Sequence, residues 1–162
     1  MDSLLGILKN PDCTPFQVGL INLALSFIGS KAPEALLEAA DSDVAEVRVA
    51  SISALGDQIQ KSDDLRAQHR VFQALEDVSA DVRAEAATLI GKSCDAEDVE
   101  TLLLNKLNDE DAKVRKNTAL SLMKLDAIGA IQQLKIAEQK EDDPDVKAVI
   151  RVAINILSAK II

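Results

Sequence analysis

The sequence predicts an all-helical repeat protein built from about five antiparallel helix pairs. Two observations carry this prediction: a phrase of acidic residues followed by Val-Arg or Val-Lys occurs four times, and apolar residues at helical spacing follow each copy. The composition agrees with it. Apolar residues make up 48% of the 162 residues, but only three are Phe and none is Tyr or Trp, so small aliphatic side chains would allow helix axes to approach closely.

The repeated phrase sets the register of the repeat. Its four copies contain the pairs Val47-Arg48, Val82-Arg83, Val114-Arg115 and Val146-Lys147, and the valines are 35, 32 and 32 residues apart. A period in the thirties holds two short helices and two turns. Each valine therefore marks the second helix of a pair.

The first unit, residues 1–30, is a degenerate copy that lacks the phrase. We expect a short helix at 3–9 and then a long helix. Its apolar positions include Leu20, Leu23, Ala24, Leu25, Phe27 and Ile28.

The other four units are expected at 31–61, 62–94, 95–126 and 127–162, within a single domain spanning 1–162. Their first helices are predicted at 33–40, 63–76, 96–108 and 127–140. Helix starts carry suitable capping chemistry at Pro33, at Ser62 to Asp64 and at Asp95. Gly56 and Gly91 each lie nine residues after their valine, where a small residue would permit a close turn at the end of the second helix.

This Asp, Val-Arg, Ala-Ala and Leu-Gly phrase resembles the HEAT-repeat family, in particular the short HEAT-like repeats of phycobilin lyases. The resemblance covers nearly the whole chain, with two departures in the last unit: Lys147 replaces Arg and Asn155 replaces Gly. It implies a right-handed α-solenoid whose second helices line the concave face. It also implies that acidic residues and Arg48, Arg83 and Arg115 of neighbouring units pair in a ladder along the stack. An alternative is a basic strip of Arg83, Arg115 and Lys116 that receives an acidic peptide or a phosphate.

Charge and cysteine content exclude several classes of protein. The net charge of −9 argues against a nucleic-acid binder, which needs a basic face. Cys13 and Cys94 are far apart and have no CxxC spacing, so neither a zinc site nor a disulfide framework is expected. Charged residues interrupt every apolar stretch, which argues against a membrane span, and residues 1–9 show no secretory signal, so we expect a cytoplasmic protein.

The sequence shows no catalytic motif. His69 is the only histidine, and it lies in a polar segment where we expect it to be solvated or to contact a neighbouring helix. No phosphate-binding glycine loop occurs. HEAT-like di-iron hydroxylases use repeated His-Glu pairs and HEAT-like DNA glycosylases use aromatic and basic groove residues, and this chain has neither. The sequence therefore predicts that the protein is not an enzyme and has no catalytic, metal-binding or cofactor-binding residue.

Two surfaces are predicted to bind a protein or peptide partner. The first is the groove formed by the second helices; its residues are Arg83, Glu85, Thr88, Lys116, Asn117, Leu120 and Lys124. The second is the C-terminal end, where Val152, Ile156 and Ile161 form a surplus apolar stripe. An apolar stripe of Phe16, Leu20, Leu23 and Phe27 marks the N-terminal end.

These ends have two interpretations: the terminal helices wrap further around their neighbours or belong to a longer array, or an exposed end forms a homodimer or partner interface. The leading functional prediction is a cytoplasmic interaction scaffold that binds its partner in the groove without catalysis. The alternative is an accessory factor for attaching a bilin cofactor, or a chaperone-like subunit of an enzyme complex.

Overall fold

A computed structural model describes residues 6, 7, 10, 14, 17, 20, 21, 23–25, 27, 33–62, 64–93 and 97–161. Within these residues the secondary structure is helical, with no β-strand. The chain divides into two compact units, Met1–Ala86 and Ala87–Ile162, and the division falls inside helix α6 (Ala80–Ser93). The predictions for Cys13, Phe16, Cys94 and Asp95 lie outside the described residues.

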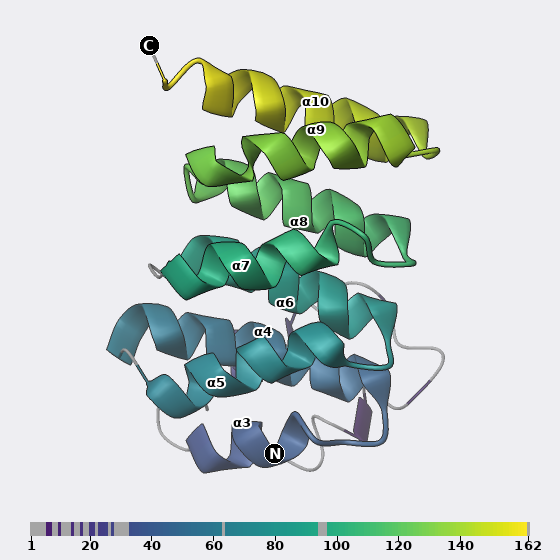
Figure 1. The fold of residues 1–162 in the computed structure, drawn as a ribbon. Helices are drawn as coiled ribbons and strands as arrows, with labels where there is room; N and C mark the ends of the chain where they lie inside the picture. Colours follow the sequence, from purple (N-terminus) through teal and green to yellow (C-terminus); the bar gives the residue numbers. More distant parts are fainter. Residues whose placement is uncertain are drawn as a thin grey trace. The chain divides into compact units, whose positions relative to one another are not determined.

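The first unit is organised around the long helix α4 (Ala45–Ser62), which contacts both α3 (Pro33–Ala39) and α5 (Leu65–Gln73) (Figure 1). A 3₁₀ turn, η1 (Ala74–Glu76), extends α5. The core of this unit consists of aliphatic side chains that are fully buried. Among them are Leu36, Ile52, Leu55, Val71 and Leu75.

The second unit is organised around α8 (Ala112–Lys124). This helix contacts α7 (Glu97–Lys106) on one side and α10 (Pro144–Ser158) on the other. Helix α9 (Ile131–Lys140), preceded by the 3₁₀ turn η2 (Ile128–Ala130), pairs with α10 (Figure 1). The fully buried residues of this unit include Leu103, Leu122, Leu134, Ile150 and Leu157.

The predicted helix pairs after residue 33 are confirmed. Each second helix contains its valine near its start, and the predicted first helices correspond to α3, α5 with η1, α7, and η2 with α9. Aspartates cap several helices: Asp111 accepts hydrogen bonds from the backbone N–H groups of Lys113 and Val114, and Asp143 accepts them from Asp145 and Val146. Asp126 has a φ of 54° just after α8, a conformation that Asp tolerates better than most residues.

Gly91 differs from its predicted role. It lies within α6 rather than at a turn, and a Cβ built on it would come within 2.4 Å of Ser121 Cβ and 2.7 Å of Ser121 Cα in α8. The hydroxyl of Ser121 donates to the carbonyl oxygen of Ala87 at 2.8 Å. Gly91 therefore permits close approach of two second helices, and the Ser121 hydrogen bond holds them at that distance.

Candidate functional site

A repeated turn lies at the start of each second helix. In each copy, the cation after the valine donates a hydrogen bond to the backbone carbonyl six residues earlier. The bonds run from Arg48 to Ser42, from Arg83 to Asp77, from Arg115 to Asp109 and from Lys147 to Glu141, with lengths of 2.8, 3.0, 2.9 and 3.1 Å. The Val-Arg phrase thus fixes the backbone entering each second helix.

The residue that provides this carbonyl also closes the turn with its own side chain. Its oxygen accepts the backbone N–H two residues later, in the pairs Ser42 with Val44, Asp77 with Ser79, Asp109 with Asp111 and Glu141 with Asp143. An acidic residue therefore closes this turn in three of the four copies, and the Ser42 hydroxyl closes it in the first.

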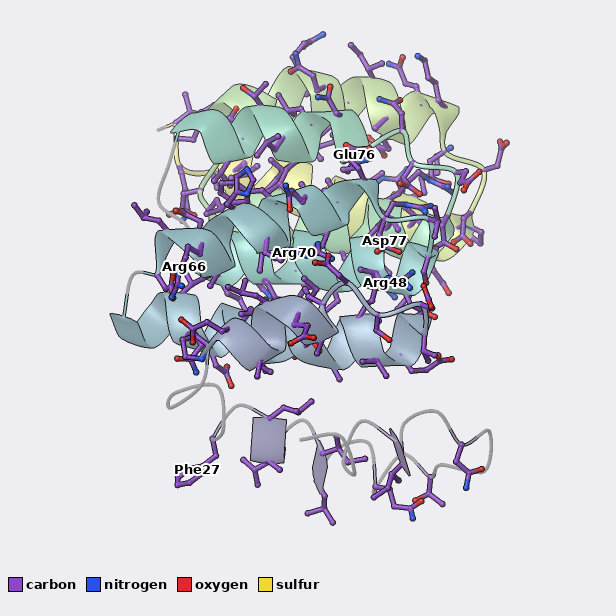
Figure 2. All side chains as sticks on the ribbon, turned by 90° about the horizontal axis from the view of Figure 1, so that it is seen from below. Phe27, Arg48, Arg66, Arg70, Glu76 and Asp77 are labelled. Carbon is purple, nitrogen blue, oxygen red and sulfur yellow. The ribbon has the colours of Figure 1, made fainter. Side chains whose placement is uncertain are left out.

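Two of these carboxylates also accept an arginine from the preceding repeat. Arg48 Nε and Nη2 donate to Asp77 Oδ2 and Oδ1 at 2.8 and 2.7 Å, and Figure 2 shows the two side chains meeting. Arg115 Nε and Nη2 donate to Glu141 Oε2 and Oε1, both at 2.7 Å. The ladder that the family resemblance implies is present at these two positions, as bidentate pairs.

Both carboxyl groups are held in their charged form. Hydrogen bonds from Arg115 lower the pKa of Glu141, against a smaller opposing effect of burial. Burial raises the pKa of Asp77, but the hydrogen bonds from Arg48 and from the Ser79 N–H, together with the charges of Arg48 and Arg70, outweigh it and lower the pKa. These pairs are part of the protein's framework.

The structure also reveals two arginines that the sequence prediction missed. Both lie on α5 and are labelled in Figure 2. Arg66 pairs with Glu34 of α3 at 3.1 Å, and Arg70 pairs with Asp41 at 3.1 Å and donates to the carbonyl of Ala40. The spacing of four residues between Arg66 and Arg70 puts them on one helix face, which is the signal that could have identified them. They tie the first helices of neighbouring pairs together.

The predicted groove residues fall into two groups. Arg83 is 7% exposed, and its guanidinium donates to the carbonyls of Asp77 and Val78, so it belongs to a turn. Lys116, Asn117 and Leu120 are half-buried and Lys124 is exposed. These four share a face of α8. Glu85 and Thr88, on α6, are half-buried.

The alternative basic strip loses two of its members. The guanidinium groups of Arg83 and Arg115 are directed to backbone carbonyls and, for Arg115, to Glu141. Only Lys116 keeps the position that this hypothesis gives it. The groove prediction therefore rests on the α8 face, within the second unit.

The predicted apolar ends are exposed where the structure describes them. At the C-terminal end, Val152, Ile156 and Ile161 are 50%, 41% and 63% exposed. At the N-terminal end, the exposed fractions are 51% for Leu20, 70% for Leu23 and 69% for Phe27.

The described residues offer few groups suited to acid–base or metal chemistry. His69 is exposed on α5, and the part of the chain that is described contains no group of three His, Cys, Asp or Glu side chains able to hold a metal ion. A pocket of about 290 Å³ in the second unit is lined by Leu107, Asn108, Arg115, Ala137, Lys140, Glu141 and Asp142. This volume is at the lower end of the range for small-molecule sites, and two of its charged residues, Arg115 and Glu141, are already paired with each other.

Comparison with known proteins identifies the repeat. The sequence profile of HEAT repeats matches residues 69–155. The chain belongs to the HEAT-repeat family. Among the described helices, none is long and apolar enough to cross a membrane.

Relatives of this HEAT-repeat chain include a bilin biosynthesis protein, MpeU, of Synechococcus sp. (strain WH8020). The two are 46% identical over 155 residues, which is 96% of this chain, and the chain spans about half (52%) of the length of that relative. The fold is that of a chain in the complex of CpcE and CpcF of phycocyanin lyase from Nostoc sp. PCC7120, with a TM-score of 0.75, 21% identity, and coverage of 94% of this chain and 96% of that one. A designed armadillo repeat protein in complex with the peptide (KR)4 also shares the fold, with a TM-score of 0.64, 18% identity, and coverage of 95% and 80%.

These comparisons correct one prediction. The prediction that the protein is not an enzyme is wrong, because the similar proteins are a bilin biosynthesis protein and a phycocyanin lyase. It took the lack of a recognisable acid–base motif as a lack of catalysis, whereas a surface that holds two reactants in the right geometry can itself accelerate a reaction. Of the two functional predictions, the comparisons favour the alternative, bilin attachment, over a non-catalytic scaffold.

Proposed function

We propose that the chain is a helical subunit of a bilin lyase, a protein that takes part in attaching a bilin to a phycobiliprotein. The observation that carries this proposal is the 46% identity to a bilin biosynthesis protein over 96% of the chain. The fold of the phycocyanin lyase supports it, since almost the whole of one chain in that complex superimposes on this one.

We propose that the chain works with a second helical subunit, by analogy with the lyase whose fold it shares. The phycocyanin lyase is itself a complex of two proteins, CpcE and CpcF. In this arrangement, the chain contributes one row of second helices. The half-buried residues Lys116, Asn117 and Leu120 on α8 then belong to the surface that contacts the protein substrate.

The contribution of the chain to catalysis is positional. A lyase of this kind must bring a bilin and an acceptor side chain together, and fixing two reactants in a productive geometry can supply a large part of the rate acceleration. The paired turns at Arg48 and Arg115 keep the second helices in register, as such a surface requires.

Deletion of the chain in its source cells tests the proposal. We expect one phycobiliprotein subunit to lose its visible absorbance, and expression of the chain from a plasmid to restore it. Covalent attachment is measured by the colour that stays with each subunit after denaturation. Full pigmentation of every phycobiliprotein subunit in the deletion strain would contradict the proposal and favour a scaffold with another purpose.

A further inference from the structure

The second helices of the second unit carry an excess of positive charge, although the chain has a net charge of −9. Helix α8 contains no acidic residue, and its basic residues are Lys113, Arg115, Lys116 and Lys124. The part of α6 that belongs to this unit adds Lys92. Most acidic residues of the unit lie in the first helices and in the turns before α8 and α10. The two signs of charge are therefore separated within the unit.

Three of these lysines, Lys92, Lys116 and Lys124, form a basic patch. Lys92 and Lys124 are exposed and Lys116 is half-buried, and within the described part of the chain their ammonium groups form no ion pair or hydrogen bond. Lys92 and Lys124 each lie ten residues after the valine of their repeat, so they occupy equivalent positions on α6 and α8. These helices touch at Gly91 and Ser121, so their axes are at most about 8–10 Å apart there. The basic patch shares only Lys116 with the strip predicted from the sequence.

An apolar stripe on α10, formed by Val149, Val152 and Ile156, lies beside the basic patch. These residues are three, six and ten positions after the valine of their repeat, a spacing that puts them on one face of the helix. Val152 is 50% exposed and Ile156 is 41% exposed. Helix α10 packs against α8, where the positions six and ten after the valine are Leu120 and Lys124. Aliphatic and ammonium groups therefore adjoin on the same face of the unit.

We propose that the basic patch and the apolar stripe together bind an acidic, amphipathic α-helix of the protein substrate. This inference rests on the proposed function, which assigns the α8 face to that substrate. An amphipathic helix places aliphatic side chains at the spacing of the apolar stripe, and carboxylates at the edge of its apolar face reach the lysines beside it. The charge of the patch is complementary to such a helix, so it would speed association and select against basic partners.

Three other occupants fit this surface less well. An extended segment needs partners for its backbone N–H and C=O groups, and the apolar stripe offers none, whereas a helix pairs these groups internally. A bilin carries two carboxylates on neighbouring rings and could engage at most two of the three lysines, and Lys116 and Lys124 alone are about 12 Å apart along α8. A second copy of the chain would bring two net charges of −9 together, which opposes association.

A synthetic peptide tests the charge requirement with the full chain. The probe is a helical peptide of about 18 residues with leucines on one face, glutamates beside them and one Trp. Because the chain contains no Trp or Tyr, the fluorescence of the peptide reports binding directly. We expect saturable binding that weakens with added salt, and binding at least tenfold weaker for a peptide with lysines in place of the glutamates. No saturable binding, or equal binding of both peptides, would overturn the proposal.

Matched lysine variants locate the binding site. Lys116→Gln with Lys124→Gln should weaken binding of the acidic peptide at least tenfold. Lys135→Gln with Lys140→Gln removes two exposed lysines of α9 and should change binding less than twofold. Each pair includes one lysine from the last turn of its helix, so the lost interaction with the helix dipole affects both variants alike. Equal weakening by the two pairs would mean non-specific attraction and would overturn the assignment.

Matched apolar variants test the stripe. Val152→Ser with Ile156→Ser should weaken binding of the acidic peptide at least tenfold, because aliphatic surface is no longer buried against it. The control is Ile128→Ser with Ile136→Ser, which alters two isoleucines of η2 and α9 that are each 42% exposed. This control should bind the peptide as the parent does, and an equal loss in both variants would contradict the proposal. Displacement of the peptide by biliverdin, a free bilin, would assign the surface to the pigment and also overturn it.

The outcome is separable from that of the proposed function. If deletion of the chain leaves all bilins attached but the peptide still binds through Lys116 and Lys124, the lyase proposal fails and the surface stands as a site for an acidic helix of another partner. If pigmentation is lost on deletion but the peptide does not bind, the binding surface fails alone. The bilin-free form of the subunit that loses its colour should displace the peptide, and failure to do so would refute its assignment as the partner.

Discussion

The bidentate pair between Arg115 and Glu141 offers a quantitative test of how the repeat is stabilised. The Glu141 side chain is only 4% exposed and that of Arg115 is 18% exposed. Arg115 donates two hydrogen bonds to the carboxylate and one each to the carbonyls of Asp109 and Glu110. Replacing Arg115 with Met keeps most of the aliphatic packing but leaves a buried carboxylate that only backbone N–H groups, such as that of Asp143, still stabilise.

We expect Arg115→Met to lower the free energy of unfolding by about 3 kcal/mol at pH 7. Breaking a buried ion pair from one side costs about 3–5 kcal/mol, and the bond from Asp143 and the partial exposure of Arg115 favour the lower end. Chemical denaturation followed by circular dichroism measures this. The matched control is Arg151→Met, which removes an exposed pair with Glu138 and should cost about 0–1 kcal/mol.

The pH dependence gives this prediction a second readout. The pKa of Glu141 is lower in the folded chain than in the unfolded chain, so ionised Glu141 stabilises the fold. This contribution is complete above the unfolded-state pKa of about 4.3 and is lost as the pH falls through the pKa of Glu141 in the folded chain. In the Arg115→Met variant, the burial of Glu141 raises its pKa instead. Protonation of Glu141 at low pH then removes the cost of burying an unpaired charge. The difference between the two chains should be largest at neutral pH and shrink below about pH 4.5.

Two results would refute this reasoning. One is an Arg115→Met variant that is no less stable than Arg151→Met. The other is a stability difference that does not change between pH 7 and pH 4, which would mean that lost packing, not the unpaired carboxylate, causes the effect.

Three further substitutions test other parts of the structure. Gly91→Ala should destabilise the chain by about 1–2 kcal/mol despite the better helix propensity of Ala, because the added Cβ would overlap the neighbouring helix. Gly6→Ala is the control and should not destabilise the chain, because no atom lies within 4 Å of its added Cβ. Thermal unfolding measures the stability of the two variants. Asp143→Ala should cost about 1 kcal/mol in chemical denaturation, because two capping hydrogen bonds are lost. Lys116→Glu with Leu120→Ala should weaken binding of the phycobiliprotein subunit at least tenfold with unchanged stability, and equal binding in a titration would count against the α8 face.

The fold could be predicted from the sequence because the same local chemistry recurs in each unit. The valine after each acidic phrase is buried in all four copies, and the cation that follows it makes the same bond to the carbonyl six residues earlier. What could not be predicted is which carboxylate an arginine reaches. Arg48 pairs with Asp77 and Arg115 pairs with Glu141. Each of these carboxylates is held in place because it also accepts the backbone N–H two residues later in its own turn.

The candidate site was less predictable for a related reason. Residues that recur in every unit mainly stabilise the repeat, so the pattern that reveals the fold draws attention to residues with structural roles. Arg83 was placed in the groove on this basis, but its guanidinium bonds to the carbonyls of Asp77 and Val78. Function is better sought where the repeat is broken.

The clearest break lies on α10. Gly91 in α6 lies nine residues after its valine and receives Ser121 of α8, whereas the equivalent position in α10 is Asn155, which is exposed on the outer side. A helix stacked on α10 cannot approach as closely at Asn155 as α8 approaches α6 at Gly91. Any helix that packs on this side must therefore either leave Asn155 at its rim or provide a hydrogen bond to the Asn155 amide, since burying the amide unpaired would cost about 1–3 kcal/mol.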